Sequence, residues 1–164
     1  MQANEKLRKN AAFVLKFLAI YIAAELIIVW LPIQGMLDWI AWVEGLLTGY
    51  TVSGNSILVS GTAFIITNSC TGLVSTSILG AIIFSLRKPE IVKKISIFLA
   101  GAIILFILNI IRIYFVVQAG AMYGAETAEQ LHVASWFAMS AAIIILWYYF
   151  TKRITKTENF SELL

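Results

Sequence analysis

Long apolar runs with few charged residues limit what this chain can fold into more than any other feature of its sequence. The first run extends from about Ala11 to Leu31, and its only charged residues are Lys16 and Glu25. About 20 predominantly apolar residues are enough for a helix to cross a hydrocarbon core about 30 Å thick. A secretory signal peptide has a shorter apolar segment, of about 7–15 residues, followed by a small-residue cleavage site, whereas this run is followed by Pro32. The sequence therefore predicts a retained transmembrane helix here.

The composition extends this expectation to the whole chain. Its residues are 60% hydrophobic and 13% charged, whereas ordinary soluble domains are about 45–50% apolar and about 25% charged. We therefore expect an all-α polytopic membrane protein with one membrane-embedded domain over residues 1–164. Four transmembrane helices are expected, at about 11–31, 70–86, 95–117 and 132–150.

The positions of the basic residues predict how these helices are oriented. Cytoplasmic loops of membrane proteins carry an excess of Lys and Arg. Eleven of the twelve basic residues precede or begin the first span, lie between the second and third, or follow the fourth: Lys6, Arg8, Lys9, Lys16, Arg87, Lys88, Lys93, Lys94, Lys152, Arg153 and Lys156. The segments 32–69 and 118–131 contain none, so we expect both termini to be cytoplasmic and these two segments to be extracytoplasmic. The twelfth basic residue, Arg112, lies within the third span.

The outer segment 32–69 is predicted to contain an interfacial helix and a small β-hairpin before the second span. On a helix, the stretch GMLDWIAWVEGLL is expected to place Leu37, Ile40, Ala41 and Leu47 near one face, Trp39 and Trp42 beside it, and Asp38 and Glu44 opposite. Tryptophan is enriched at membrane interfaces. Runs of β-branched residues around Ser53-Gly54-Asn55 and Ser60-Gly61 predict the hairpin. Its edges must face water or protein, because open strand edges are not tolerated in lipid.

Three reactive or charged side chains are expected at a similar depth on neighbouring spans. Cys70, the only cysteine, begins the second span on its outer side, and His132, the only histidine, begins the fourth. Arg112 lies five residues before the outer end of the third span at Val117, or roughly 7–8 Å deep at ~1.5 Å per residue. The topology therefore brings a thiol, a guanidinium and an imidazole toward one place.

Each of these residues also has a non-catalytic interpretation. A lone Cys is often a small buried hydrophobe, a lone His at a helix start is often an interfacial cap, and Arg112 can extend to the nearby interface. However, an Arg within a span costs ~2.5–3.5 kcal/mol on insertion scales and usually faces the bundle interior. Asn109 lies three residues earlier on the same helical face, so an Asn/Arg pair is predicted to point inward. The convergence of the three residues favours a functional site.

Acyl transfer is the chemistry that fits this set. A thiolate is the reactive form of Cys, and the pKa of a thiol falls at a helix N-terminus or beside a cation. In a Cys–His couple the imidazole takes and returns protons, and the tetrahedral intermediate needs an oxyanion donor, for which Arg112 or backbone N–H groups after Cys70 are candidates. Gly72 would allow close approach of the backbone and Thr71 would orient a proton. No Asp or Glu is placed to direct His132; Glu129 lies three residues before it, and Asn109 is another candidate for orienting it.

Other classes of function have little support. One Cys and one His cannot form the usual closed zinc site, no C-x-x-C motif is present, and no glycine-rich phosphate loop or nucleic-acid signature occurs. We therefore expect no metal, no cofactor and no nucleic-acid partner.

Three short motifs, in this order, resemble the exosortase/archaeosortase family: SCTGLVS at the start of one span, LNIIRI (108–113) in the next and LHVASW (131–136) at the start of the last. The CTGL form is similar to the archaeal branch. The resemblance covers roughly residues 60–140 and implies a polytopic cysteine transpeptidase. It matches Cys70 to the nucleophile, Arg112 to the arginine of an N-x-x-R motif and His132 to the last catalytic position. Many relatives are longer and have further spans before the Cys.

The resemblance also implies the partners. Family substrates are membrane-anchored proteins that end in a short motif, a transmembrane helix and a basic tail. They are cleaved at the extracytoplasmic face and passed to an acceptor, a membrane lipid in the archaeal case. Arg112 would either stabilise developing negative charge or hold a substrate carboxyl or lipid headgroup. The alternative hypothesis is a non-enzymatic four-span adaptor or small transporter subunit that binds an anionic ligand through Arg112.

Overall fold

The computed structural model describes residues 2–59, 61–155 and 163, with side chains from residue 7 onward. The described residues form five α-helices, one short 3₁₀ helix and three strands. In chain order they are α1 (Gln2–Trp30), α2 (Gln34–Thr48), β1 (Thr51–Ser53), β2 (Ser56–Val59), β3 (Thr62–Ile65), the 3₁₀ helix Asn68–Cys70, α3 (Leu73–Ser85), α4 (Ile91–Tyr123) and α5 (Ala125–Thr155).

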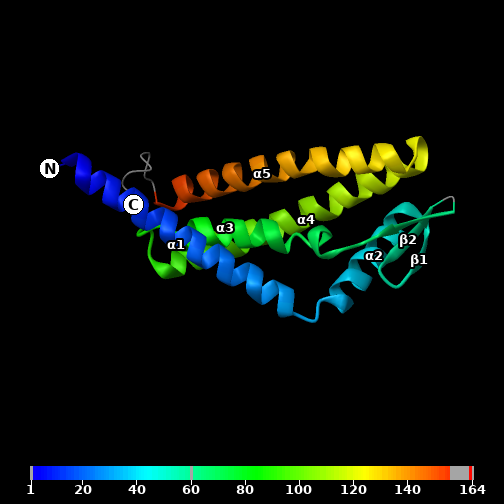
Figure 1. Ribbon diagram of the computed structural model, residues 1–164, viewed down its shortest axis with the longest axis horizontal. Coiled ribbons are helices and arrows are strands. Elements are labelled where there is room, and N and C mark those ends of the chain that lie inside the picture. Colours follow the sequence, from blue (N-terminus) through cyan, green and yellow to red (C-terminus); the bar gives the residue numbers. More distant parts are fainter. Residues whose placement is uncertain (1, 60, 156–162, 164) are drawn as a thin grey trace.

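The molecule is elongated and has two parts (Figure 1). At one end α3 packs against α1, α4 and α5, and α4 lies along α5 over most of its length. At the other end α2 and the small sheet pack together, and α2 also contacts α4. The two long helices α4 and α5 therefore connect a helical bundle to an α/β end, which we call the outer module (α2 with β1–β3).

Three of the four expected spans are helices long and apolar enough to cross a membrane: Leu7–Trp30, Ile91–Tyr123 and Ala125–Thr155. The count of four is not confirmed, because the second expected span, 70–86, is the 13-residue helix α3. At about 1.5 Å per residue α3 is about 20 Å long, which is less than a hydrocarbon core of about 30 Å. The first residues of the expected span, 70–72, belong to the turn before the helix.

The expected bounds of the third and fourth spans are too short, because the segment 118–131 between them is helical except at one position. α4 continues to Tyr123, and α5 begins at Ala125 rather than near His132. Gly124 separates the two helices with φ +94°, a left-handed value that glycine adopts readily. The 33 residues of α4 make a helix about 50 Å long, so both long helices extend beyond a single membrane thickness.

Both chain ends lie at the bundle end, away from the outer module (Figure 1). The backbone N–H groups of Arg87 and Lys88 donate to the carbonyl oxygen of Leu163, which fixes the α3–α4 connection beside the C-terminus. The three groups of basic residues in the sequence therefore meet at one end of the molecule. Lys156 and the side chain of Lys6 lie outside the described residues. That this end is cytoplasmic stays a prediction.

Helix α2 buries a different face from the one expected. Leu37, Ile40 and Ala41, which were predicted to share a face, are buried together, but Glu44 is 0% exposed and Leu47 is 56% exposed. The physical reason is the helical period: seven residues make nearly two turns, so Glu44 lies directly above Leu37. A carboxyl group thus faces the inside of the outer module.

The predicted hairpin is part of a larger sheet. β1, β2 and β3 form an antiparallel meander in the order β1-β2-β3, with Val52 opposite Ile57 and Ile57 opposite Phe64. The β1–β2 turn contains Gly54 at φ +57°. Ile57 and Val59 point toward α2 and α4 and are buried, so the meander closes the outer module.

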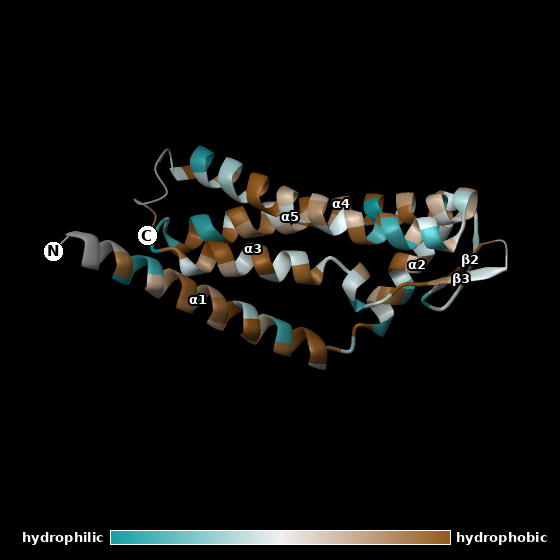
Figure 2. Cartoon of the chain, turned by 45° about the horizontal axis from the view of Figure 1, so that its top comes forward, coloured by the Kyte–Doolittle hydropathy of each residue, from teal (hydrophilic) through white to brown (hydrophobic). Residues whose placement is uncertain are grey.

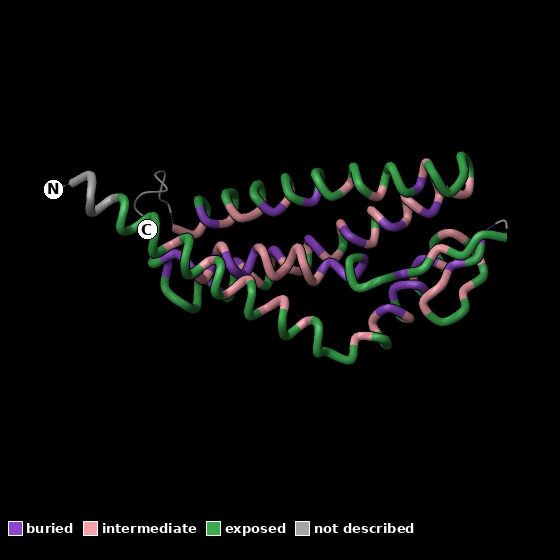
Figure 3. Tube along the Cα trace, in the orientation of Figure 1, coloured by how far each residue is buried: buried purple, intermediate pink, exposed green. Residues whose placement is uncertain are grey.

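The buried apolar side chains form two clusters, and Figure 3 shows buried positions, in purple, both in the bundle and in the outer module. The outer cluster contains Leu37, Ile40, Ala41, Ile57, Val59, Ile66, Cys70, Ile113 and Val117. The bundle cluster contains Leu79, Ile83, Ile97, Leu105, Met139 and Ile143. Cys70 therefore belongs to the outer cluster, although the helix that follows it packs in the bundle.

Helix α1 is apolar along most of its length and lies on the outside of the bundle (Figure 2). None of its most apolar 18-residue window is buried, which suits a surface that faces lipid. Glu25, the acidic residue within this span, accepts a hydrogen bond of 2.6 Å from Ser77 Oγ of α3. This contact gives the carboxyl group a partner and joins α1 to α3.

Candidate functional site

Cys70 lies in a tight turn before α3, not in the first turn of the helix as expected. It ends the 3₁₀ helix Asn68–Cys70, and Gly72 is the N-cap of α3. Its N–H donates to the carbonyl oxygen of Thr67 at 2.8 Å. The side chain is 8% exposed, and Thr67 Oγ1 lies 3.7 Å from the sulfur. A hydroxyl is thus the hydrogen-bonding neighbour of the thiol.

Gly72 and Asn109 hold this turn against α4. Gly72 has φ +75°, and a Cβ there would lie 3.3 Å from the Cβ of Asn109. Asn109 is 1% exposed, and its Nδ2 donates to the carbonyl oxygen of Cys70 at 2.5 Å. The close approach predicted for Gly72 is therefore an approach to α4. Because this amide binds the Cys70 backbone, Asn109 fixes the position of Cys70, and the suggestion that it orients His132 has no support.

Thr71 has a local structural contact. Its side chain is buried, and its hydroxyl donates to the carbonyl oxygen of Asn68 at 2.7 Å and accepts from the N–H of Leu73 at 3.3 Å. These two bonds join the 3₁₀ helix to α3. The hydroxyl is thus committed to the turn rather than free to orient a proton.

Arg112 faces the turn from α4, one helical turn beyond Asn109, as the spacing predicted. Its Nη2 donates to the carbonyl oxygen of Ser69 at 3.4 Å. The guanidinium lies within electrostatic range of both the Cys70 thiol and the His132 ring. Its Nε is buried, with no hydrogen-bond partner among the described residues. Arg112 thus points toward the Cys70 turn.

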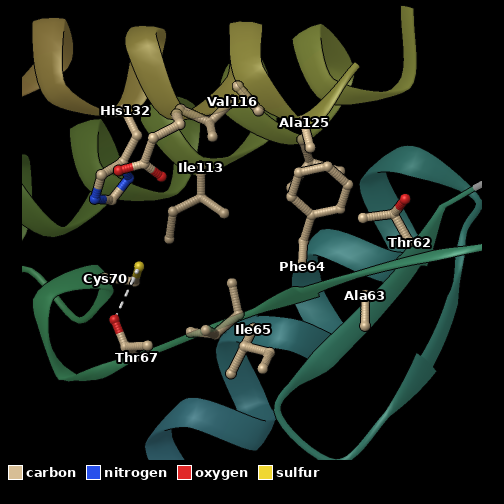
Figure 4. Close-up of a pocket in the computed structure, with 14 residues that line it drawn as sticks. Thr62, Ala63, Phe64, Ile65, Thr67, Cys70, Ile113, Val116, Ala125 and His132 are labelled. Atoms are coloured by element: carbon tan, nitrogen blue, oxygen red, sulfur yellow. Dashed lines mark hydrogen bonds between the residues drawn. The ribbon is translucent and has the colours of Figure 1, made fainter.

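His132 lies on α5, across a pocket from Cys70. The pocket has a volume of about 420 Å³. Figure 4 shows the imidazole and the sulfur facing each other across it. Three elements contribute its lining: Thr62–Thr67 from β3 and the segment after it, Ile113, Val116 and Val117 from α4, and Ala125, Ala128, Glu129 and His132 from α5. Cys70 completes the lining.

Glu129 and Trp136 are the neighbours of His132 on its own helix. Glu129 lines the same pocket and lies within electrostatic range of the imidazole. The Trp136 ring packs edge-on, with its centroid 5.8 Å from that of His132. Of the two candidates for orienting His132, Glu129 is therefore the one that shares its pocket.

The structure thus brings Cys70, Arg112 and His132 together, from three segments that are far apart in the sequence. Sequence reasoning missed the parts that Thr67 and β3 play in the site. The spacing of three residues between Thr67 and Cys70 is the signal for Thr67. The β-branched run around Ser60-Gly61 indicated strand structure there, but the place of β3 beside the pocket had no local signal, because it depends on pairing with β2. Within the described residues no group of three His, Cys, Asp or Glu side chains is placed to hold a metal ion.

Comparison with protein families gives one match. A family model described as transmembrane exosortase matches residues 5–148. Comparisons with curated proteins and with solved structures gave no match. The matched range includes most of α1, the outer module, the Cys70 turn, α3 and α4, and most of α5.

Proposed function

This chain belongs to the transmembrane exosortase family, and we propose that it is a membrane-embedded cysteine transpeptidase that processes C-terminal sorting signals. The observation that carries this proposal is the pocket that Cys70 and His132 line together, with Arg112 beside the Cys70 turn. A thiol beside a cation and across from an imidazole has the groups that acyl transfer needs.

In the proposed reaction the Cys70 sulfur attacks the carbonyl carbon of the scissile peptide bond. A carbon–sulfur bond forms, and the carbon–nitrogen bond breaks. The thiol proton passes to His132 and then to the leaving amine. An acceptor then gives its proton to His132 and takes the acyl group from the thioester. The carbon–sulfur bond breaks, and His132 returns the proton to the sulfur, which restores the thiol. Substrate between the two side chains would complete the geometry, since catalytic hydrogen bonds often tighten only in the complex.

Arg112 is the favoured donor to the oxyanion. The N–H groups of Cys70 and Thr71 already donate to the carbonyl oxygens of Thr67 and Asn68, at 2.8 and 3.2 Å, and the N–H of Leu73 donates to Thr71 Oγ1. These groups are therefore engaged in the turn. The buried Nε of Arg112 has no partner among the described residues, so the guanidinium has donor capacity left for a developing negative charge.

The substrate proposed is a protein anchored by a C-terminal apolar span with a basic tail. Such a span would insert with its basic end beside the basic end of the bundle, and the segment before it would then reach the depth of the pocket. A membrane lipid is the proposed acceptor. The termini would be cytoplasmic and the pocket extracytoplasmic, as the distribution of Lys and Arg predicts.

Processing of a co-expressed reporter tests this function. The reporter carries an extracytoplasmic tag and the last residues of a co-encoded protein that ends in a short motif, an apolar span and a basic tail. Cys70→Ala and Cys70→Ser should abolish processing while the protein still accumulates in the membrane. Undiminished processing by Cys70→Ala would refute the proposal. A variant Arg112→Ala that alone loses function would favour a binding protein for anionic ligands instead.

A further inference from the structure

We propose that the free edge of β3 binds the substrate segment before the scissile bond as an added β-strand. This inference rests on the proposed function and concerns the same pocket. Strand addition uses main-chain hydrogen bonds for affinity and alternate side chains for specificity. It would deliver an extended peptide along β3 to Cys70.

The edge of β3 is free among the described residues. The sheet order is β1-β2-β3, so only β2 pairs with β3. The N–H of Ile66 donates to the carbonyl oxygen of Asn55, and Asn55 Nδ2 donates to the carbonyl oxygen of Ile66, both at 2.8 Å. Backbone groups of alternate residues point to the same side of a strand. Those of Ala63 and Ile65 therefore point away from β2.

The pocket lies along this edge. Six consecutive residues, Thr62–Thr67, line it. Side chains of successive residues in a strand point to opposite faces, so a pocket that reaches all six lies beside the strand rather than over one face. Figure 4 shows β3 running along the pocket toward Thr67 and Cys70. A peptide paired with β3 would therefore lead to the sulfur.

The opposite wall limits what can bind. This wall consists of the ends of α4 and α5. Phe64 packs closely on Gly120 of α4, since a Cβ on Gly120 would lie 2.3 Å from the Phe64 ring. A volume of about 420 Å³ between β3 and these helices has room for a single extended chain. The sheet of a second copy would bring further strands and the helices behind them. We therefore commit to a substrate peptide as the occupant.

Disulfide mapping tests the register. The chain has one cysteine, so Cys70→Ala gives a cysteine-free background. Ala63→Cys in this background is combined with the tagged reporter, in which a single Cys is moved through the segment before the cleavage site. Oxidation should link Cys at alternate reporter positions at least about tenfold more efficiently than at the positions between them, because paired strands present side chains with a period of two.

Thr51→Cys is the matched control. Thr51 and Ala63 both pair with Leu58, so they lie on the same face of the sheet at opposite edges. The control should give no periodic crosslinks. Equal crosslinking at all reporter positions, or links between two copies of Ala63→Cys in place of reporter links, would overturn strand addition.

A proline variant supplies the second test. Ile65→Pro removes an N–H that points to the free edge and leaves the bonds to β2, whereas Ile65→Ala removes side chain but keeps that N–H. Ile65→Pro should reduce reporter crosslinking at least about tenfold more than Ile65→Ala; equal reduction would contradict the proposal. Processing by the wild-type chain is measured in parallel. Cleavage without periodic crosslinks would contradict strand addition but not the proposed function. Periodic crosslinks without cleavage would contradict the proposed function but not strand addition.

Discussion

The bundle and the outer module differ in what their cores contain. The bundle cluster is apolar and packs by close approach: a Cβ at Gly101 would lie 2.5 Å from a methyl carbon of Leu79. The outer cluster includes Cys70, and the outer module encloses Glu44, whose two carboxyl oxygens are buried without a hydrogen-bond partner among the described residues. The bundle also buries polar side chains, but those of Ser85 and Lys94 donate to backbone carbonyl oxygens. The two parts thus differ in the buried thiol and the unpartnered carboxyl group of the outer part.

The surroundings of the two parts explain this difference. Apolar burial adds little to helix association in lipid, because lipid tails are as apolar as leucine, so close packing dominates there. In water, burial of apolar surface is the main driving force. If the outer module projects from the membrane, as the charge distribution predicts, its core is stabilised as in a soluble domain. Such a core can hold a substrate pocket at the membrane surface.

The largest expected effect separates catalysis from packing at the boundary of the two parts. Arg112→Ala should lower kcat by about 10²–10³-fold, the usual cost of losing one oxyanion donor, because the guanidinium lies beside the Cys70 thiol. Reporter cleavage under saturating substrate measures this change. Arg112→Lys keeps the charge but not the guanidinium geometry and should recover part of the rate. An effect on KM alone would assign Arg112 to substrate binding.

A pair of core truncations tests whether the two parts depend on different forces. Ile57→Ala in the outer module should cost about 2–5 kcal/mol of unfolding free energy, since both transfer and cavity contribute. Leu79→Ala in the bundle should cost less in lipid, where only packing is lost. Both side chains are 0% exposed, so their burial is matched. Unfolding is followed in lipid nanodiscs, and equal costs for the two variants would contradict the comparison.

Glu44 should make the outer module sensitive to pH. Burial raises the pKa of its carboxyl group from 4.5 to about 7. The neutral form is therefore favoured in the folded state. The stability that the neutral carboxyl group of Glu44 allows is fully present below pH 4.5, and it is lost as the pH rises from 4.5 to about 7. Glu44→Gln cannot ionise, so above pH 7 it should be more stable than the wild type by up to about 3 kcal/mol, at about 1.4 kcal/mol per pH unit.

Unfolding of the wild type and of Glu44→Gln at pH 4.5, 6 and 8 measures this difference. The two curves should converge at the lowest pH. If Glu44→Gln is more stable than the wild type by the same amount at all three pH values, the rise in pH does not ionise the Glu44 carboxyl group, and the predicted pH sensitivity is contradicted. The bundle variant Leu79→Ala is the control, since its effect should not change with pH.

Much of the fold follows from local sequence patterns. The apolar runs predicted α1, α4 and α5. The single cysteine and the single histidine predicted two residues of the pocket, and the arginine within a span predicted the cation beside the Cys70 turn. The burial of Glu44 could also be predicted from the sequence, because its spacing of seven residues from Leu37 places both residues on the same face of the helix. These features depend on periodicity and hydropathy alone.

The rest depends on contacts between distant segments. The turn at Cys70 is fixed by Asn109, 39 residues away, so its 3₁₀ geometry has no local signal. The edge of β3 is set by pairing with β2 and by the bond from Ile66 to Asn55. The length of α4 beyond Val117 was underestimated because its last residues are less apolar, although they are still compatible with a helix.

Direct detection of a thioester on Cys70 tests the central claim. The wild-type protein is incubated with the reporter, quenched in acid and measured by intact mass spectrometry, with Cys70→Ser as the control. We predict a mass increase equal to the reporter fragment before the cleavage site, located on Cys70 and removed by hydroxylamine. Reporter cleavage by Cys70→Ala at the wild-type rate, or attachment of the fragment to another residue, would contradict it.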